Sequence, residues 1–406
     1  DTTMGRSLIA DFYFDTHMDE LAEVIREYIS YQAIDGFTTF SSHIVGLRKM
    51  PAYTQLVREG RMPVRFAFSN RFCQQVEPDI PGCFLRSGDY AGLGDDTNYF
   101  WNVGLTLGGI DNGPPAICTT MEAPPELKSK EDCIIQPGNA YWRAVYSAIR
   151  SRYRYVVNHT WGDKGVDYVL DIIDQIMKEN PTFSLDFVRS QRYSSDHCGF
   201  YPTPSQLPRM AKYNWHISCA SNALTRSAPY LKVYRGDYAG RIAPLASAIK
   251  AGVTPSLEAE AGIDMHDPDG VQPMHLISLP FITRKNRWGD AIAPEEAVNR
   301  NQLMKMSTTW ASRYVLKEKQ LGSLEAGKLA DYVVWNKDYF SVPEADLGTV
   351  YPVMTVLGGK TVLLREEYAR ELGTTAIGHQ AKFNFKEEVP GEVSMEQLLR
   401  GGSGGE

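Results

Sequence analysis

Two histidines and a short acidic segment have the side-chain types of a hydrolytic zinc site. His159 directly follows an aromatic and β-branched run, and His197 lies in a Ser-Asp-His-Cys motif further along the chain. A third run ends with the carboxylates Glu258 and Glu260. Such zinc sites combine imidazole nitrogens with a carboxylate oxygen and keep one position open for water, whose pKa the metal lowers. Because a nearby carboxylate can carry the water's proton to a leaving nitrogen, these residue types favour metal-dependent hydrolysis of a carbon–nitrogen bond.

The predicted strands and helices place these side chains at one end of a parallel sheet. Residues 153–158 are typical of a buried strand, and apolar residues recur at helical spacing from Gly165, so His159 lies on a βα loop. In a parallel barrel these loops form the C-terminal face, where active sites collect. The sequence therefore predicts an α/β fold of the TIM-barrel type. Further predicted elements are a strand–helix unit around His197 (185–188 and 206–213), a strand (215–220), a helix (245–251) and the acidic strand (252–262).

Other histidines, and His159 itself, have alternative interpretations. His159 could be hydrogen-bonded within a tight loop instead of binding a metal. His216 is at the start of its predicted strand, away from the catalytic face, and we interpret it as structural. His266 follows the acidic strand and is a candidate for substrate contact, with a solvated turn as the alternative.

Four motifs resemble the amidohydrolase superfamily, in the branch of N-substituted formamide deformylase-like metal-dependent hydrolases. Residues 159–167 are similar, nearly position by position, to the strand-five motif of that branch, and Asp196-His197 resembles its Glu-His pair on strand six. Residues 256–261 are similar to its strand-eight Leu-Gly-Ser-Asp-x-Pro motif, which aligns Glu260 with the catalytic aspartate and leaves Glu258 as the second choice. Residues 321–334 resemble the return strand into its small β-sandwich. The resemblance extends from about residue 20 to residue 364.

The resemblance implies a TIM-type (β/α) barrel with a small β-sandwich domain built from the chain ends. Residues 1–310 would form the barrel, with a loop-rich insertion at about 77–136, and residues 311–375 would form the C-terminal sandwich portion, including a hairpin around Gly358. Residues 376–406 would be a tail and flexible linker. Aromatic residues of the insertion, namely Tyr90, Tyr99, Phe100 and Trp101, could line a substrate pocket or pack the loop down.

The activity implied by the resemblance is metal-dependent cleavage of an amide or related C–N bond in a small organic molecule. His159, His197 and Glu260 would hold zinc or another divalent metal, and Glu260 would pass the proton of the attacking water to the leaving group. One alternative is a family member recruited to a cyclisation, dehydration or isomerisation that uses the same three residues as acid–base groups. A non-catalytic scaffold is the other alternative.

The sequence departs from the family pattern in ways that affect the metal site. The family's first barrel strand carries His-x-His, which this chain lacks. His17 and Asp19 could be a degraded version, but we prefer a capping box of Thr16 and Asp19 that starts a helix over 20–33, followed by a strand at 36–40. Gly104 stands where the family has a lysine, so no carbamylated lysine can bridge two metals. We therefore expect a mononuclear site.

If that helix and strand match later family elements, the chain begins partway through the barrel. A missing barrel strand would leave buried backbone groups unpaired. We expect an N-terminal partner polypeptide, produced by proteolytic processing, to complete the barrel; a shortened chain is the alternative. The family's habits also allow a homo-oligomer.

Composition indicates an ordinary soluble enzyme. The formal net charge of −7 gives no reason to expect nucleic-acid binding, and no apolar run is long enough for a membrane span. We favour a cytoplasmic location, with a secreted or periplasmic one as the alternative if the N-terminus is processed. The six cysteines lack Cys-x-x-Cys spacing, which argues against a zinc knuckle or a disulfide framework, although Cys73 and Cys83 could pair in an oxidising compartment. Cys198 is either a functional thiol beside His197 or a small buried side chain.

Overall fold

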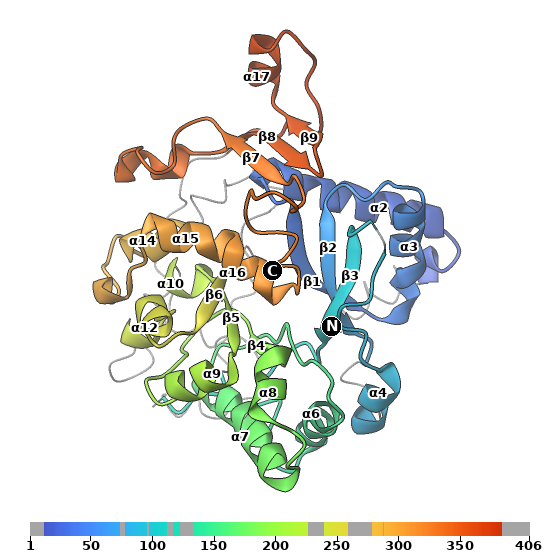
Figure 1. Cartoon of the computed structure of the whole chain (residues 1–406), viewed down its shortest axis with the longest axis vertical. Coiled ribbons are helices and arrows are strands. Elements are labelled where there is room, and N and C mark those ends of the chain that lie inside the picture. Colours follow the sequence, from blue (N-terminus) through green and yellow to red (C-terminus); the bar gives the residue numbers. More distant parts are fainter. Residues whose placement is uncertain are drawn as a thin grey trace.

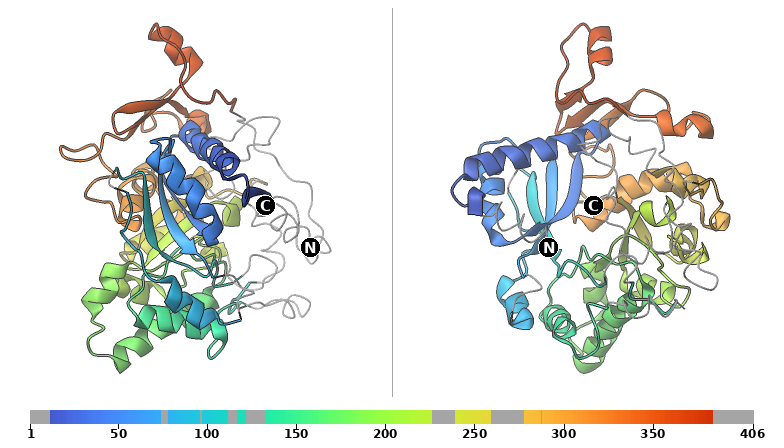
Figure 2. Two further views of the ribbon diagram at one scale, coloured as in Figure 1. Left: turned by 90° about the vertical axis from the view of Figure 1, so that its right-hand side faces the viewer. Right: turned by 180° about the vertical axis from the view of Figure 1, so that it is seen from behind.

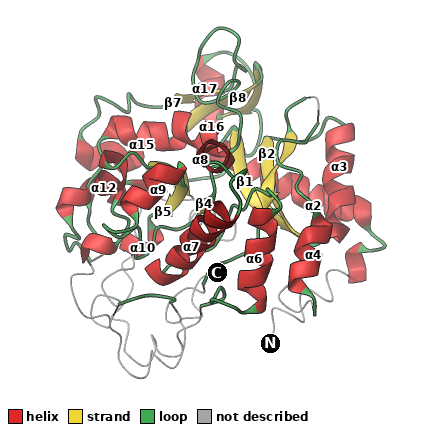
Figure 3. Ribbon diagram, turned by 60° about the horizontal axis from the view of Figure 1, so that its bottom comes forward, coloured by secondary structure: helices red, strands yellow, loops and turns green. Residues whose placement is uncertain are grey.

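The computed structural model describes most of the chain, namely residues 12–73, 78–95, 97–111, 117–121, 133–225, 239–258, 278–286 and 288–383. Two parallel three-stranded sheets form the body of the molecule, and a three-stranded antiparallel sheet lies at one end (Figure 1). Helices lie outside the parallel strands, as a second direction of view also shows (Figure 3). This is the TIM-barrel type of α/β architecture that the strand–helix order predicts.

The first parallel sheet consists of β1 (Thr39–Val45), β2 (Arg65–Arg71) and β3 (Phe100–Leu105), in that order. Helices α2 (Met18–Tyr31) and α3 (Met50–Arg58) cover its outer face. Phe66 and Phe68 join the apolar cluster beneath these helices, whereas Ala67 packs in a separate cluster with Trp101. Because strand side chains alternate between faces, the odd-numbered residues of β1 and β2 face the interior of the barrel.

The second parallel sheet consists of β4 (Ser194–Ser195), β5 (His216–Ala220) and β6 (Thr254–Glu258). Residues 153–159 join the two sheets through parallel bridges Leu105↔Tyr155 and Gly109↔His159 on one side. On the other side, the backbone amide of Asp196 donates to the carbonyl of Asn158 at 2.9 Å. The predicted buried strand at 153–158 is thus an irregular extended segment that holds the central position of the sheet.

Helices follow and cover the central strands. The long helix predicted after Gly165 is α7 (Asp163–Glu179), and the predicted helices at 206–213 and 245–251 are α9 (Leu207–Tyr213) and α12 (Leu245–Lys250). The strand expected at 185–188 is wrong, because these residues belong to α8 (Leu185–Gln191), whose first turn is capped by the Ser184 hydroxyl. The other helices with described bounds are α4 (Ile80–Ser87), α6 (Ala140–Arg150), α10 (Asn222–Thr225), α14 (Pro280–Thr283), α15 (Arg300–Ser307), α16 (Thr309–Tyr314) and α17 (Glu366–Glu371). Short 3₁₀ helices span Gln32–Asp35, Leu47–Lys49, Ala239–Arg241, Pro294–Glu296 and Glu344–Thr349.

The capping box predicted for Thr16 and Asp19 is wrong. Helix α2 begins after His17, and no side chain caps it. The Thr16 hydroxyl donates to the carbonyl of Tyr13 at 3.1 Å, and Asp19 accepts a 2.8 Å bond from Gln55 of α3. These polar side chains therefore stabilise the approach to α2 and its contact with α3, and not its first turn.

The antiparallel sheet consists of β7 (Tyr332–Trp335), β8 (Pro352–Leu357) and β9 (Lys360–Leu364), and it projects beyond the barrel together with α17 (Figure 2). Its β8–β9 hairpin confirms the turn predicted around Gly358. A buried bidentate ion pair between Arg65 of β2 and Asp331, with N–O distances of 2.7 and 3.0 Å, ties this sheet to the barrel. The second sheet of the predicted β-sandwich and the predicted domain boundaries remain predictions.

Disulfide bonds join all six cysteines in pairs, namely Cys73–Cys83, Cys118–Cys133 and Cys198–Cys219. The expectation that the cysteines form no disulfide framework is therefore wrong, whereas the pairing of Cys73 with Cys83, raised as a possibility, is present. Cys198 is buried, as one alternative had it, but it is not a functional thiol because it is bonded to Cys219. Sequence spacing failed here because the last pair joins the loop after β4 to β5, which only the parallel sheet brings together. Within the described ranges, no helix combines the length and apolar character that crossing a bilayer requires.

Candidate active site

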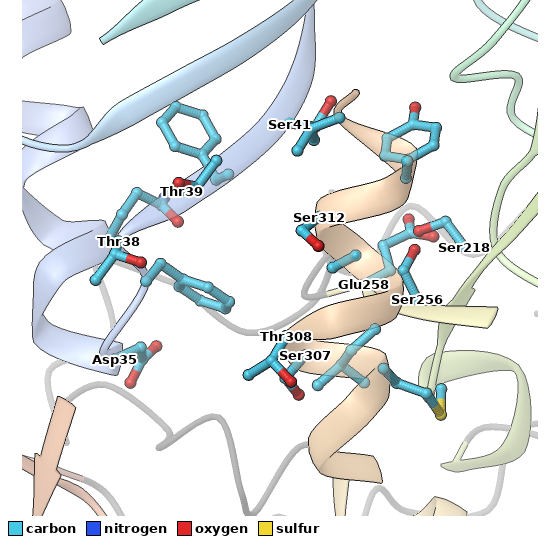
Figure 4. Close-up of a pocket in the computed structure, with 18 of the residues that line it drawn as sticks. Asp35, Thr38, Thr39, Ser41, Ser218, Ser256, Glu258, Ser307, Thr308 and Ser312 are labelled. Atoms are coloured by element: carbon cyan, nitrogen blue, oxygen red, sulfur yellow. The ribbon is translucent and has the colours of Figure 1, made fainter. Parts of the chain in front are cut away.

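A cavity of about 1290 Å³ opens between β1, the ends of the central strands and α16. Hydroxyl side chains line much of it: Thr39 and Ser41 of β1 lie across from Ser312 of α16, with Ser256 and Glu258 of β6 behind (Figure 4). At the ends of the parallel strands the cavity lining includes His43, Arg71, Asp111, His159, His197 and Glu258. The chemistry-bearing side chains of the described residues thus gather at one face of the barrel.

The structure brings together the two histidines that the sequence singled out. Their ring centroids are 4.4 Å apart and the rings are inclined by 75°. His159 ends the extended segment and pairs with Gly109, and His197 lies two residues after the end of β4. Their proximity follows from their equivalent positions at the ends of adjacent parallel strands.

In each of these two histidines, the Nδ1 atom is hydrogen-bonded to an oxygen atom of the protein. His159 Nδ1 lies 3.0 Å from the backbone carbonyl of Asp111, so Nδ1 donates and Nε2 carries the lone pair. His197 Nδ1 lies 2.6 Å from Oε1 of Glu258. Metal-binding histidines have this arrangement, in which a carbonyl or carboxylate holds one ring nitrogen and orients the other toward the metal. The pair therefore fits two imidazole ligands that would bind through Nε2.

Glu258 is the carboxylate that the structure places beside His197. Besides the Nδ1 contact, its Oε2 accepts a 3.0 Å bond from the backbone amide of His197. Glu260, the preferred acidic residue, lies outside the described residues, as does His266. Within the described ranges, no three His, Cys, Asp or Glu side chains group as a metal site. The described part of the site thus supplies two nitrogen donors and one supporting carboxylate.

Asp111 supports the loop that carries His159, and sequence reasoning missed it. Its side chain is buried; Oδ1 accepts from the amide of Trp161 at 2.8 Å, and Oδ2 accepts from the amides of Gly162 and Cys118 at 2.7 and 3.1 Å. Burial raises its pKa to about 7, against the lowering effect of these three bonds. Its place in the loop after β3 was the available signal, because that loop also belongs to the C-terminal face.

His43 was also missed, because the predicted strand at 36–40 ended before it. It lies on β1, and its Nε2 is 3.5 Å from a guanidinium nitrogen of Arg71 at the end of β2. Burial, then the charges of Arg71 and His197, lower the pKa of His43 to about 4. Burial, followed by His197, lowers that of His159 to about 3. Both rings are neutral at physiological pH, which is the state that ligates metals.

Gly104 of β3 stands where no larger side chain fits. Its φ of 136° is in a region that side chains rarely adopt, and a Cβ there would lie 2.5 Å from the carbonyl oxygen of Arg154. A lysine at this position would need the central segment to move. The fold is therefore built without the bridging lysine of the family pattern.

The remaining candidates lie away from the histidine pair. His17 and Asp19 are at the start of α2 and do not line the cavity. His216 is buried at the start of β5, with Nε2 2.8 Å from the Ser256 hydroxyl, which agrees with a structural role. The aromatic residues proposed for a pocket do not line the cavity either: Tyr90 is exposed, Tyr99 packs under Arg65, and Phe100 and Trp101 are buried in apolar clusters.

Comparison with known proteins agrees with this architecture. The sequence profile of the amidohydrolase family matches residues 8–363, so the chain belongs to that family. No curated protein matches the sequence.

The fold is similar to that of several solved structures. These include an uncharacterised metal-dependent hydrolase from Pyrococcus horikoshii OT3 (TM-score 0.61, 14% identity, 81% of this chain and 62% of that chain) and one from Pyrococcus furiosus (TM-score 0.57, 17% identity, 79% and 60%). A triazine hydrolase variant is also similar (TM-score 0.50, 16% identity, 86% and 72%). The chain spans about 60% of the length of the two Pyrococcus proteins.

Proposed function

We propose that this protein is a metal-dependent hydrolase that cleaves an amide or related C–N bond of a small organic molecule. The observation that carries the proposal is the His159–His197 pair, in which each Nδ1 is held by an oxygen at the back of the cavity. Membership of the amidohydrolase family and the likeness to metal-dependent hydrolases support it. We also propose that Glu260 is the third ligand and the proton carrier.

The donor set fits a divalent metal such as zinc, held by His159, His197 and the proposed Glu260. When bound, a divalent ion lowers the pKa of water and polarises a carbonyl, which is the chemistry that amide hydrolysis needs. We propose one ion per site, because Gly104 has no room for a bridging lysine.

The protein's own groups prepare this site in the absence of substrate. The Asp111 carbonyl fixes the tautomer of His159, and the Glu258 carboxylate fixes both the ring and the backbone of His197. The Asp111 side chain in turn anchors the amides of Trp161 and Gly162, just beyond His159. Each histidine is therefore oriented by hydrogen bonds that need no rearrangement when substrate binds.

We further propose that a second polypeptide completes the barrel. Among the described residues, β1 and β6 are at the two ends of the parallel strand order, and neither pairs with a strand on its outer side. An additional strand at this opening would satisfy those backbone groups.

An amine-release assay tests the proposed activity. Zinc-reconstituted protein and protein treated with EDTA are incubated with a panel of N-formyl and N-acyl amines, cyclic amides and ureas, and the products are identified by mass spectrometry. We expect zinc-dependent release that His159→Ala and His197→Ala abolish and that His379→Ala, a surface histidine paired with Glu27, leaves unchanged. Release that survives both site substitutions would reject the proposal.

A further inference from the structure

Arg71 is a cavity-lining cation that has no carboxylate partner among the described residues. Arg71 ends β2 and lines the cavity together with His159 and His197. Within the described ranges, no carboxylate lies within 4.0 Å of its guanidinium, whose hydrogen-bond contact is the 3.5 Å approach to His43. Arg65, at the other end of the same strand, instead forms a bidentate pair with Asp331. Among the described residues, Arg65 thus has a carboxylate partner and Arg71 has none.

The surroundings of Arg71 hold its guanidinium in place. Gly108 has a φ of 100°, and a Cβ there would overlap the guanidinium, so this group rests directly on the Gly108 backbone. His43 contacts it from β1. Arg71 and the histidine pair line the same cavity, so a ligand in the cavity can contact both.

Two of the described carboxylates beside the histidine pair, Asp111 and Glu258, have partners other than Arg71. Asp111 accepts three backbone amides, and both oxygens of Glu258 bind His197. A half-buried guanidinium has lost part of its hydration and presents a planar fork that matches a carboxylate. Arg71 therefore presents a positive charge to the cavity that also contains the His159–His197 pair.

From this geometry we infer that Arg71, positioned by His43 and Gly108, binds the carboxylate of the substrate. The substrate class is then a small amide that carries a carboxylate, with the anion at the end of β2 and the amide at the His159–His197 pair. This assignment of substrate class rests on the proposed hydrolase function, whereas the anion site itself depends only on Arg71.

Binding to metal-free protein tests the anion site separately from catalysis. EDTA-dialysed protein is titrated, by calorimetry or ligand-observed NMR, with acetate, benzoate and N-acetylglycine and with the matched neutral amides acetamide, benzamide and N-acetylglycinamide. We expect at least one acid to bind about tenfold more tightly than its amide. Arg71→Gln should remove this preference, and Arg71→Lys should retain only part of it because a lysine cannot form the bidentate contact. Arg48→Gln, at an exposed arginine paired with Asp15, is the matched control and should behave as wild type.

Three results would overturn the inference: wild-type protein that binds no acid more tightly than its amide, Arg71 variants that keep the full preference, or acid binding that requires zinc. If Arg71→Gln does not fold, the wild-type selectivity and the Arg71→Lys variant still decide the question. Arg71-dependent binding without any hydrolysis would reject the hydrolase proposal and leave the anion site in place. Zinc-dependent hydrolysis that is as fast for neutral amides as for the matched carboxylate-bearing amides, with Arg71→Gln affecting neither, would support the hydrolase and reject the carboxylate-bearing substrate class.

Discussion

Replacing Glu258 by glutamine removes the charge behind His197 and keeps the length of the side chain. In the structure, Oε1 is 2.6 Å from His197 Nδ1, and Oε2 is 3.0 Å from the backbone amide of His197. Both contacts need an acceptor, and a glutamine amide offers one oxygen and one NH₂ group. If the oxygen keeps the backbone amide, the NH₂ group faces Nδ1, and the ring can satisfy it only by moving its proton to Nε2. The lone pair that would bind metal is then lost.

The expected size of this effect follows from the bond that is lost. A hydrogen bond to a charged group contributes about 1.5–3 kcal/mol, which corresponds to roughly a 10- to 100-fold weaker metal affinity. Zinc affinity is measured by competition with a chromophoric chelator, and the tautomer of His197 by ¹⁵N NMR. Glu318→Gln, which alters a half-exposed carboxylate paired with Arg192, is the control. Zinc affinity within twofold of wild type and an unchanged tautomer in Glu258→Gln would refute the reasoning.

Three further predictions concern stability and covalent structure. Burial lowers the pKa of His216 to about 3 in the folded protein, against about 6.5 in the unfolded chain. The stability that the neutral ring contributes is therefore present above about pH 6.5 and is lost as the pH falls from there towards about 3. Between pH 7.5 and 5.0, the free energy of unfolding measured with urea should fall less for His216→Gln than for wild type. Gly104→Ala should lower the free energy of unfolding by about 1–3 kcal/mol, because its Cβ would meet the Arg154 carbonyl, and an unchanged melting temperature would contradict this. Denatured, unreduced protein should show no thiol by titration and six after reduction. Free thiols before reduction would argue against the three disulfides.

Local patterns predicted the elements whose signals lie within one segment. The apolar spacing after Gly165 and the glycine turn of the β8–β9 hairpin determine α7 and that hairpin almost independently of their surroundings. Residues 185–188 were wrongly predicted as a strand, because four residues are too few to distinguish the periodicity of a strand from that of a helix. The capping signal of Ser184 was also overlooked. Short segments depend on their caps and on tertiary contacts.

The sequence predicted those site residues that a single local segment indicates, and missed the contacts that join different strands. His159 follows a strand that the sequence predicted, whereas His197 follows the two-residue strand β4, which it did not. The convergence of the two histidines was therefore expected from parallel topology with the wrong strand before His197. The partnership of His197 with Glu258, and of His43 with Arg71, joins different strands through a register that the sequence does not state. The disulfide between Cys198 and Cys219 has the same origin, because its cysteines approach only when β4 and β5 pair.

The metal content of the purified protein tests the central claim most directly. Wild type, His159→Ala, His197→Ala and the surface control His379→Ala are dialysed against zinc, freed of excess metal and analysed by mass spectrometry for zinc per chain. We predict about one zinc in wild type and in His379→Ala, and loss of zinc from both site variants although they stay folded by circular dichroism. A wild-type protein that retains no zinc or other divalent metal, or site variants that retain it fully, would contradict the account.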